Sequence, residues 1–386
     1  MAAYLPNFSE AARIESRAVR ISDPVKRLRY LRGEMVRRPV GPLAKKRRKF
    51  PAFRYFSVSL PLLAALIPWP SPKGSAEILQ RERELLVPRA TGSPASEAPV
   101  PRVWLVDHTE NTEVYSNGLR VDLTFLTSNR PRARFSVYSL AGAAEPVKFG
   151  DAPVGIVYHT TESLIEPFEE DENRRLKQLG HNLLEVVRGE RAYHYVIDRF
   201  GRVFAVVRES DAANHAGNSV WADSQGIYVN LNDSFLGVAF EAQTGEDEAV
   251  TPAQIHSAKV LTEALRSRYG IAAEDCVTHA QVSVNPRNMH IGVHTDWAGD
   301  FPFAKLGLPD NYDIPLASIY AFGFQSDEAY DRAVGMHFSG AALALEQMEK
   351  QAAAQQISVA QYRAILRHRF KDIAAELQER ENEGGN

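Results

Sequence analysis

Polar residues able to bind a metal or to move protons recur in the middle of this chain of 386 residues, close to the ends of expected strands. Two imidazoles and one carboxylate suit a Zn²⁺ ion, and a fourth position left to water makes such a site catalytic rather than structural. A bound zinc ion lowers the pKa of its water to about 7 and polarises a carbonyl. Each histidine alone would more often be structural, so the prediction depends on the whole set. In chain order, the set is His159, Tyr193, His194, His215, Glu241, His279, His294 and Asp296, with Asn214 and Trp297 next to members of the set in the sequence.

The single cysteine limits the kind of metal site that the chain can form. It excludes an intrachain disulfide framework, an all-cysteine zinc finger and an iron–sulfur cluster. A metal site must therefore be built mainly from His, Asp and Glu. Cys276 precedes His279 on the same expected strand, and we interpret it as a small buried residue.

The segment 151–312 shows the strongest alternation of strand and helix patterns, which indicates an α/β domain. One helix is expected at 174–187 from its leucine spacing. A second helix begins after Thr251-Pro252, an N-cap followed by proline at the first helical position, and ends at Gly270. Strands are expected at 154–158, 193–198, 202–207, 235–242 and 276–279.

Both flanks of this segment carry further elements. Short β-type runs in residues 103–150 predict extra strands joined to the α/β domain, with a separate small β module as the alternative. Residues 313–386 are expected to form a helical extension. A helix capped by Ser358 would carry an apolar stripe that must be buried against the main domain or against a partner. The stripe consists of Tyr362, Ile365, Leu366, Phe370, Ile373 and Leu377.

The first 102 residues differ in composition from the rest of the chain. Residues 1–54 hold about 15 Lys and Arg against about 4 Asp and Glu, although the whole chain has a net charge of −3. An apolar run follows at 55–69, and residues 70–102 have the composition of a linker. A basic stretch before an apolar run is typical of a signal sequence or signal anchor. We therefore expect a basic cytoplasmic arm, a signal or anchor segment, a linker and an exported body.

This arrangement predicts a protein of the cell envelope, in the periplasm or at the extracellular face, with anchoring in the inner membrane through residues 55–69 as one option. The apolar run is shorter than the ~20 residues that span a bilayer comfortably. The alternatives are a basic tail beside a short buried segment, or a misassigned start codon before a normal signal peptide. The near balance of charge argues against nucleic acid as a partner.

Residues 153–312 resemble the zinc-dependent N-acetylmuramoyl-L-alanine amidase family, whose fold is shared with peptidoglycan recognition proteins and small phage lysozyme-type amidases. Six motifs of this sequence follow one another in the family's order, and together they are specific although each is weak alone. The resemblance implies a mixed central β-sheet flanked by helices. The motifs are residues 156–161, 192–201, 214–217, 232–241, 278–279 and 294–296.

The resemblance implies that His159, His279 and Asp296 bind Zn²⁺, and that Tyr193 stabilises the oxyanion or positions the water. The implied reaction is hydrolysis, by a zinc-activated water, of the amide between N-acetylmuramic acid and L-alanine in peptidoglycan or muropeptides. The alternative is a non-catalytic peptidoglycan-binding protein of the same fold. The residues expected to contact substrate, with packing roles as the alternative, are His194, Asn214, His215 and Trp297.

Two positions depart from the family's pattern. Ala239 stands where family members have a glutamate thought to act as general base. Glu241 lies two residues on, on the same face of the strand but about 7 Å away, and we expect it to substitute. His294 stands where several members have a lysine, and a histidinium there would stabilise the developing charge only while protonated. Tyr193 would then carry more of the catalytic work.

The stretch between His279 and His294 is longer than usual in the family. His290 and Asp300 are therefore kept as alternative ligands to Asp296.

Overall fold

The computed structural model describes residues 100–140, 144–244, 250–335 and 338–384. The basic arm expected at 1–54 and the apolar segment expected at 55–69 lie outside these residues, as does nearly all of the linker expected at 70–102. Within the described ranges, no helix is both long and apolar enough to cross a membrane.

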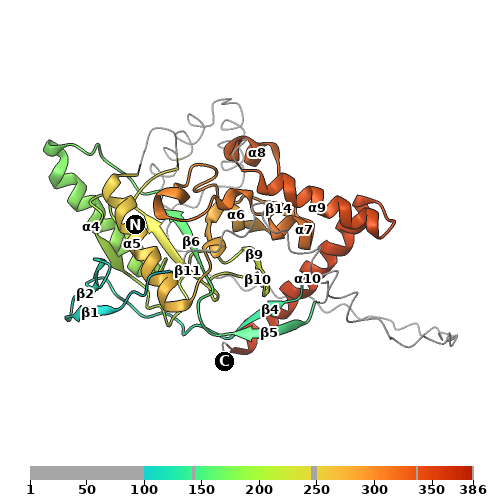
Figure 1. Ribbon diagram of the computed structural model, residues 1–386, viewed down its shortest axis with the longest axis horizontal. Helices are drawn as coiled ribbons and strands as arrows, with labels where there is room; N and C mark the ends of the chain where they lie inside the picture. Colours follow the sequence, from blue (N-terminus) through green and yellow to red (C-terminus); the bar gives the residue numbers. More distant parts are fainter. Residues whose placement is uncertain (1–99, 141–143, 245–249, 336–337, 385–386) are drawn as a thin grey trace, which may run out of the picture. The chain divides into compact units, whose positions relative to one another are not determined.

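A mixed sheet of eight strands forms the centre of the α/β domain (Figure 1). In spatial order its strands are β1 (Leu105–His108), β2 (Thr112–Tyr115), β3 (Arg120–Asp122), β8 (Val203–Ala205), β7 (Tyr195–Ile197), β11 (Phe235–Phe240), β6 (Gly155–Thr160) and β12 (Cys276–Thr278). β11 pairs in parallel with β6 and β7, and β6 pairs in parallel with β12. β7 and β8 are antiparallel, as are β1, β2 and β3, whereas β3 and β8 are parallel. The expected mixed central sheet is confirmed.

Two long helices flank this sheet, α4 (Asn173–Glu190) and α5 (Pro252–Tyr269). Val196 and Ala239 share one apolar cluster with side chains of α4. Val238, the strand neighbour of Ala239, lies in another cluster with side chains of α5. Because successive residues of a strand point to opposite faces, the two helices cover opposite faces of the sheet.

The ends of α5 follow the local sequence. The Gln254 amide donates a hydrogen bond to the Thr251 hydroxyl at 3.1 Å, and the Thr251 amide donates one to the Gln254 side chain at 3.0 Å. This reciprocal pair satisfies amide groups that have no partner within the helix. Gly270 ends the helix with φ +66°, a left-handed conformation that glycine adopts without a steric penalty. Both ends lie where the sequence predicted them.

A second sheet of four antiparallel strands has the order β5-β4-β10-β9. Its strands are β4 (Phe135–Tyr138), β5 (Pro146–Gly150), β9 (Val220–Asp223) and β10 (Gly226–Val229). The strands expected in residues 103–150 are therefore divided between two sheets. β1 to β3 extend the central sheet at one edge, while β4 and β5 pair with the later hairpin of β9 and β10.

The C-terminal region is helical, and its last helix packs against the rest of the described chain (Figure 1). Its helices are α7 (Ala317–Phe322), α8 (Glu328–Val334), α9 (Gly340–Ala354) and α10 (Val359–Gly384). Leu366 of α10 lies in an apolar cluster with side chains of α9, and Phe370 lies in the main core. The Arg380 guanidinium donates a hydrogen bond to the Ser136 hydroxyl of β4 at 2.6 Å. The apolar stripe of this helix is thus buried against its own chain and not left for a partner. Ile365 is the exception, because it is 56% exposed, and its placement on the stripe was wrong.

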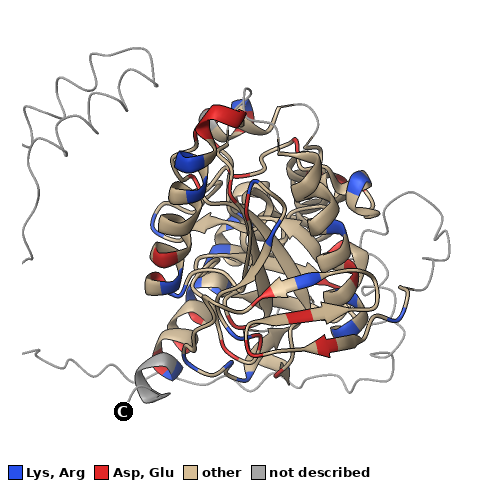
Figure 2. Ribbon diagram, turned by 90° about the vertical axis from the view of Figure 1, so that its left-hand side faces the viewer, with Lys and Arg blue, Asp and Glu red and all other residues tan. Residues whose placement is uncertain are grey.

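The remaining elements are short. They are α6 (His279–Val282), β13 (Val284–Asn285), β14 (His290–Ile291) and the 3₁₀ helices Glu170–Glu172, Ala273–Asp275, Phe303–Leu306 and Asn311–Asp313. Figure 2 shows acidic and basic residues interspersed on the outer helices and loops, while the central strands are mostly uncharged. Histidines and carboxylates that are buried in such a core need polar partners.

Candidate metal centre and active site

Two histidines and one aspartate meet in a buried cluster. His159, His279 and Asp296 each offer one ligand atom, and these atoms all lie within 4.8 Å of one another. Nδ1 of His279 lies 3.0 Å from Oδ1 of Asp296, and Nδ1 of His159 lies 3.3 Å from Oδ2 of Asp296. The structure thus brings together the three residues that the resemblance implied as ligands. The third donor is Asp296, and neither of the alternatives, His290 and Asp300, belongs to the cluster.

Adjacent parallel strands deliver the two histidines. His159 lies near the carboxyl end of β6, and His279 directly follows β12 at the start of α6. The two strands are in register at Tyr158 and Thr278, so the histidines leave neighbouring positions at the same edge of the sheet. Open α/β sheets place their binding sites at the carboxyl ends of parallel strands.

Asp296 is held by a loop that folds back on α6. Its carbonyl accepts a hydrogen bond from the Ala280 amide at 3.3 Å, and the Trp297 carbonyl accepts one from the Tyr312 hydroxyl at 2.5 Å. Trp297 has φ +61°, which is uncommon for a bulky residue. Its ring is 6% exposed and lies edge-on to Phe240, with 5.4 Å between centroids. Trp297 therefore packs in the core, which is the alternative that the sequence left open for it.

Tyr193 and His294, both expected to be catalytic, border the cluster on different sides. The ring centroid of Tyr193 lies 5.0 Å from that of His159. The His294 ring stacks on His279, with centroids 4.3 Å apart and 15° between the planes. Tyr193 has φ +57°, a strained conformation of the kind that collects at functional sites.

His159 and Asp296 have the protonation states that metal binding requires. Burial, aided by His279, lowers the pKa of His159 to about 4. Burial raises the pKa of Asp296, but its polar contacts with the two imidazoles outweigh this effect and hold that pKa well below its ordinary value. At neutral pH a neutral imidazole therefore faces an ionised carboxylate, as metal ligation demands.

Burial also shifts the pKa values of His294 and Tyr193, which border the cluster. Burial, and then His279, lowers the pKa of His294. This disfavours the protonated form in which His294 was expected to act. Burial raises the pKa of Tyr193, so its hydroxyl stays protonated and remains a hydrogen-bond donor.

A family model described as N-acetylmuramoyl-L-alanine amidase matches residues 149–296. The match contains His159 and His279 and ends at Asp296, so it covers the whole cluster. Residues 149–296 belong to this amidase family. The other described residues, from both flanks of the amidase domain, lie outside the match.

Three solved structures illustrate what the chain is similar to. The N-acetylmuramoyl-L-alanine amidase LysC from Clostridium intestinale URNW is 20% identical over 47% of this chain and 93% of its own, with a TM-score of 0.26. The amidase AmiD from E. coli, in complex with an anhydro-N-acetylmuramic acid peptide, is 23% identical over 42% and 58%, with a TM-score of 0.31. The Drosophila peptidoglycan recognition protein SD is 17% identical over 41% and 84%, with a TM-score of 0.26. A comparison with curated proteins finds no match.

Ala239 is the residue of the amidase domain that lies beside His159 on the neighbouring strand β11. Glu241, two residues on, is buried at another place. Its carboxylate accepts a hydrogen bond from the Arg199 amide at 3.1 Å, and it lies 3.5 Å from where a side chain on Gly180 of α4 would begin. Burial raises the pKa of Glu241. The structure therefore holds this carboxylate under α4 and does not bring it into the metal cluster.

His194 and Asn214, both expected to contact substrate, form hydrogen bonds with backbone groups of the amidase domain. The fully buried His194 accepts a hydrogen bond at Nδ1 from the Gly237 amide at 3.0 Å, and its Nε2 lies 3.1 Å from the Asp211 carbonyl. The Asn214 side chain donates a hydrogen bond to the Glu190 carbonyl at 3.0 Å. These contacts match the packing roles that the sequence left open as the alternative.

A cavity of about 660 Å³ opens beside the cluster. His279 and His294 line it, together with residues 284–287 from β13 and the turn of the β13–β14 hairpin. This hairpin accounts for the long stretch between the two histidines. Arg287 and Asn218 also line the cavity, and the sequence analysis missed them because no spacing or motif marks either residue. The polar residues of the lining are His215, Asn218, His279, Asn285, Arg287 and His294.

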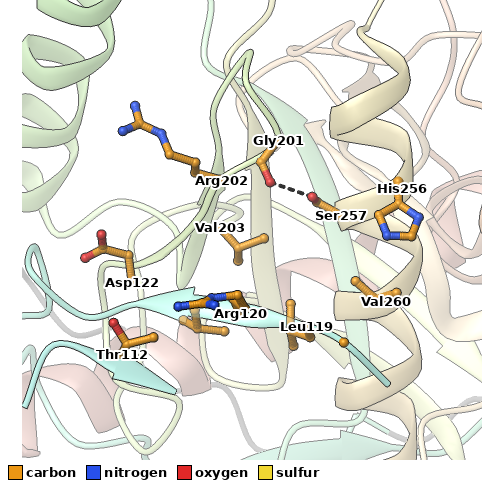
Figure 3. Close-up of a pocket in the computed structure, with 12 residues that line it drawn as sticks. Thr112, Leu119, Arg120, Asp122, Gly201, Arg202, Val203, His256, Ser257 and Val260 are labelled. Atoms are coloured by element: carbon orange, nitrogen blue, oxygen red, sulfur yellow. Dashed lines mark hydrogen bonds between the residues drawn. The ribbon is translucent and has the colours of Figure 1, made fainter. Parts of the chain in front are cut away.

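A second cavity, of about 370 Å³, lies between β3, β8 and α5 (Figure 3). Figure 3 shows Arg202 and His256 on opposite sides of it, directed away from each other. The Ser257 hydroxyl donates a hydrogen bond to the Gly201 carbonyl at 2.5 Å. Ligand sites place a few polar groups that converge on one point. Because these groups do not converge, the cavity beside the metal cluster is the candidate active site.

Proposed function

We propose that this protein is a zinc-dependent N-acetylmuramoyl-L-alanine amidase, which hydrolyses the amide between the lactyl group of N-acetylmuramic acid and L-alanine in peptidoglycan or muropeptides. The observation that carries the proposal is the buried convergence of His159, His279 and Asp296 within residues 149–296, the segment that matches the amidase family.

The donor set fits zinc. Two imidazole nitrogens and one carboxylate oxygen are ligands that zinc accepts, and three protein ligands are the number found in catalytic zinc sites. Asp296 lies between the two histidines and is 8% exposed, so a cation would neutralise a buried negative charge. When bound, zinc supplies a Lewis acid that polarises the amide carbonyl and makes water a stronger nucleophile.

The side chains around this cluster then have distinct tasks. Tyr193, beside His159, donates a hydrogen bond to the carbonyl oxygen as negative charge develops on it. His294, on the cavity side of His279, is placed to accept the proton of the attacking water and to return it to the leaving amine. The cavity beside these residues receives the peptide or sugar on either side of the scissile bond.

This proposal assigns proton transfer to His294 and not to Glu241. Its carboxylate is held by the Arg199 amide under α4, whereas His294 lines the cavity next to a ligand. A general base must lie within hydrogen-bond reach of the proton that it takes. His294 meets this condition in the structure better than Glu241 does.

The direct test combines zinc content with product analysis. The full chain is purified, its zinc is measured, and it is incubated with purified sacculi and with soluble muropeptides. We expect stoichiometric zinc, and free stem peptides beginning with L-alanine in the mass spectrum. His159→Ala should lose both zinc and activity, whereas the matched control His290→Ala should keep both. Wild-type protein with zinc but without released peptide would overturn the proposed reaction.

One observation favours a second function, binding of peptidoglycan without cleavage. Ala239 lies beside His159, where the family's general base would stand. A binding protein would sediment with sacculi and hold zinc yet release no peptide. The mass analysis above separates the two functions, because only the amidase generates a free L-alanine amine.

We also propose that the protein works in the cell envelope. Support comes from the basic residues at 1–54 followed by the apolar run at 55–69. Fractionation of cells that produce the full chain tests this. Recovery of the protein in the cytoplasm alone would contradict it.

A further inference from the structure

The buried side chain of His215 lies between a metal-ligand histidine and a backbone carbonyl. Its Nδ1 lies 3.1 Å from Nε2 of His159, and its Nε2 lies 3.3 Å from the Phe235 carbonyl oxygen. The rings of His215 and His159 are nearly perpendicular, at 86°, with centroids 5.3 Å apart. Both ring nitrogens of His215 therefore have one identified partner each.

These two contacts determine where the protons lie. A carbonyl oxygen can only accept a hydrogen bond, so Nε2 of His215 must carry the proton that it donates to Phe235. A neutral imidazole has one such proton, which leaves Nδ1 of His215 as an acceptor. Its partner, Nε2 of His159, must then be the donor. Nδ1 of His159 then has a lone pair, and a metal ion between it and the Asp296 carboxylate, 3.3 Å away, would bind both groups.

The opposite arrangement is disfavoured by the same geometry. If His159 carried its proton on Nδ1, two nitrogen lone pairs would face each other at 3.1 Å, or His215 would have to turn its own proton toward His159. In the second case the bare Nε2 of His215 would face the Phe235 carbonyl oxygen at 3.3 Å. With a metal ion between Nδ1 of His159 and Asp296, either arrangement leaves a buried polar atom without a hydrogen bond, which is costly. Without a metal, the Asp296 carboxylate, 3.3 Å from Nδ1 of His159, would instead favour a proton on that nitrogen.

The position of the His215 ring is built by elements outside the metal cluster. A Cβ atom on Gly237 would lie 2.6 Å from Cγ and 2.9 Å from Nδ1 of His215, so the ring lies against a place where only glycine fits. The Asn232 side-chain oxygen accepts hydrogen bonds from the backbone amides of His215 and Ala216, at 2.9 and 2.7 Å. The His215 ring therefore packs against Gly237 of β11, and the Asn232 side chain holds the backbone of His215 in place.

We propose that His215 is a positioning residue that selects the tautomer of His159 and thereby presents Nδ1 of His159 to zinc. The inference rests on the proposed zinc site, and it assigns His215 a role other than substrate contact. Partners that hold a metal-ligating histidine in one tautomer commonly change metal affinity by about 10- to 100-fold when they are removed.

The first test measures zinc affinity by competition with a chelator, on the full chain. His215→Leu should weaken zinc binding by about 10- to 100-fold. His215→Asn should restore most of it, because the Asn Oδ1 takes the place of Nδ1 as an acceptor. Gly237→Ala should weaken binding as well, although it changes no side chain that contacts the metal. His256→Leu, in the second cavity, is the matched control and should bind zinc like wild type.

The second test uses the zinc-loaded protein, because without zinc the Asp296 carboxylate competes for a proton on Nδ1 of His159. Long-range ¹H–¹⁵N spectra should show His159 protonated on Nε2 in wild type and in His215→Asn, and zinc ligation divided between Nδ1 and Nε2 of His159 in His215→Leu. The inference is overturned if His215→Leu binds zinc like wild type, if His215→Asn is as weak as His215→Leu, or if His159 is protonated on Nδ1 in wild type. Wild-type protein that bound no zinc would overturn the proposed function together with this inference.

Discussion

Ala239 and His159 lie side by side on the parallel strands β11 and β6, paired in register. Residues paired in this way point to the same face of the sheet, so a methyl group occupies the place from which a longer side chain on β11 would reach the cluster. Ala239 is fully buried among apolar side chains of α4 and β7. The catalytic groups of this protein must therefore come from elsewhere, and the predictions below follow from where the structure holds them.

Replacing Glu241 by glutamine should leave kcat within about threefold of wild type, since Glu241 does not lie within reach of the cluster. The glutamine oxygen can still accept the hydrogen bond from the Arg199 amide, so the fold should persist. Muropeptide cleavage at saturating substrate measures the effect. A loss of more than a hundredfold would identify Glu241 as the general base.

Replacing His294 by alanine should lower kcat by about 10²- to 10⁴-fold, the usual contribution of a general acid or base. Zinc content should not change, because His294 stacks on a ligand without being one of the three clustered donors. His368→Ala, on an exposed face of α10, serves as the control. If His294→Ala lost its zinc, the lower rate would say nothing about proton transfer and His294 would be a ligand.

Replacing Tyr193 by phenylalanine should lower kcat by about 10²- to 10³-fold, with little change in KM or zinc affinity. The ring that packs against His159 is kept, and only the hydroxyl that donates to the developing oxyanion is lost. Steady-state kinetics on a soluble muropeptide distinguish the two parameters. An increase in KM at unchanged kcat would instead mean that the hydroxyl binds substrate.

The stability of the zinc-free protein should fall as the pH is lowered from about 6.5 to about 4. Burial lowers the pKa of His159 to about 4 and that of His194 to about 3, the latter aided by Arg132. In that range the unfolded chain, with ordinary histidine pKa values near 6.5, binds more protons than the folded protein. Each group can then reduce the free energy of unfolding by as much as about 1.4 kcal/mol per pH unit. Thermal unfolding followed by circular dichroism should show Tm falling across this window, and a constant Tm would contradict neutral buried histidines.

Replacing Arg287 by alanine should raise KM about tenfold for stem peptides with free carboxylates, and leave kcat nearly unchanged. Arg287 supplies the permanent positive charge of the cavity lining, and a charge-assisted hydrogen bond to a carboxylate is worth about 1.5–3 kcal/mol. Muropeptides in which the stem carboxylates are amidated should lose this dependence. Arg332→Ala, an exposed arginine of α8, is the control, and equal KM values for the two variants would remove Arg287 from substrate recognition.

Much of the candidate site was predictable from the sequence because it depends on local order along the chain. The histidines end or follow short apolar strands, and strands of that kind pair in parallel with their carboxyl ends at one edge. His159 and His279 were therefore expected at the same edge of the sheet, and the family resemblance implied that they share a metal. The ends of α5 were equally predictable, since Thr251, Gln254 and Gly270 act within one turn of the helix.

What the sequence could not determine is the surroundings of each side chain, because those come from elements far apart in the chain. Spacing correctly put Glu241 on the same face as Ala239, but the Arg199 amide and Gly180 of α4 hold its carboxylate away from the cluster. From the sequence, His215 was expected to contact substrate. In the structure its ring packs against Gly237 and lies within hydrogen-bond distance of the Phe235 carbonyl and of His159.

The same division holds for the whole chain. The sequence by itself determined the alternation of strands and helices through short-range periodicity, and its resemblance to the amidase family implied which residues are the ligands. Only the tertiary structure decided that β4 and β5 leave the central sheet, that α10 packs on its own chain, and that a hairpin carries Arg287 to the cavity. Such choices depend on which distant surfaces fit together, and on which buried polar atoms thereby find partners.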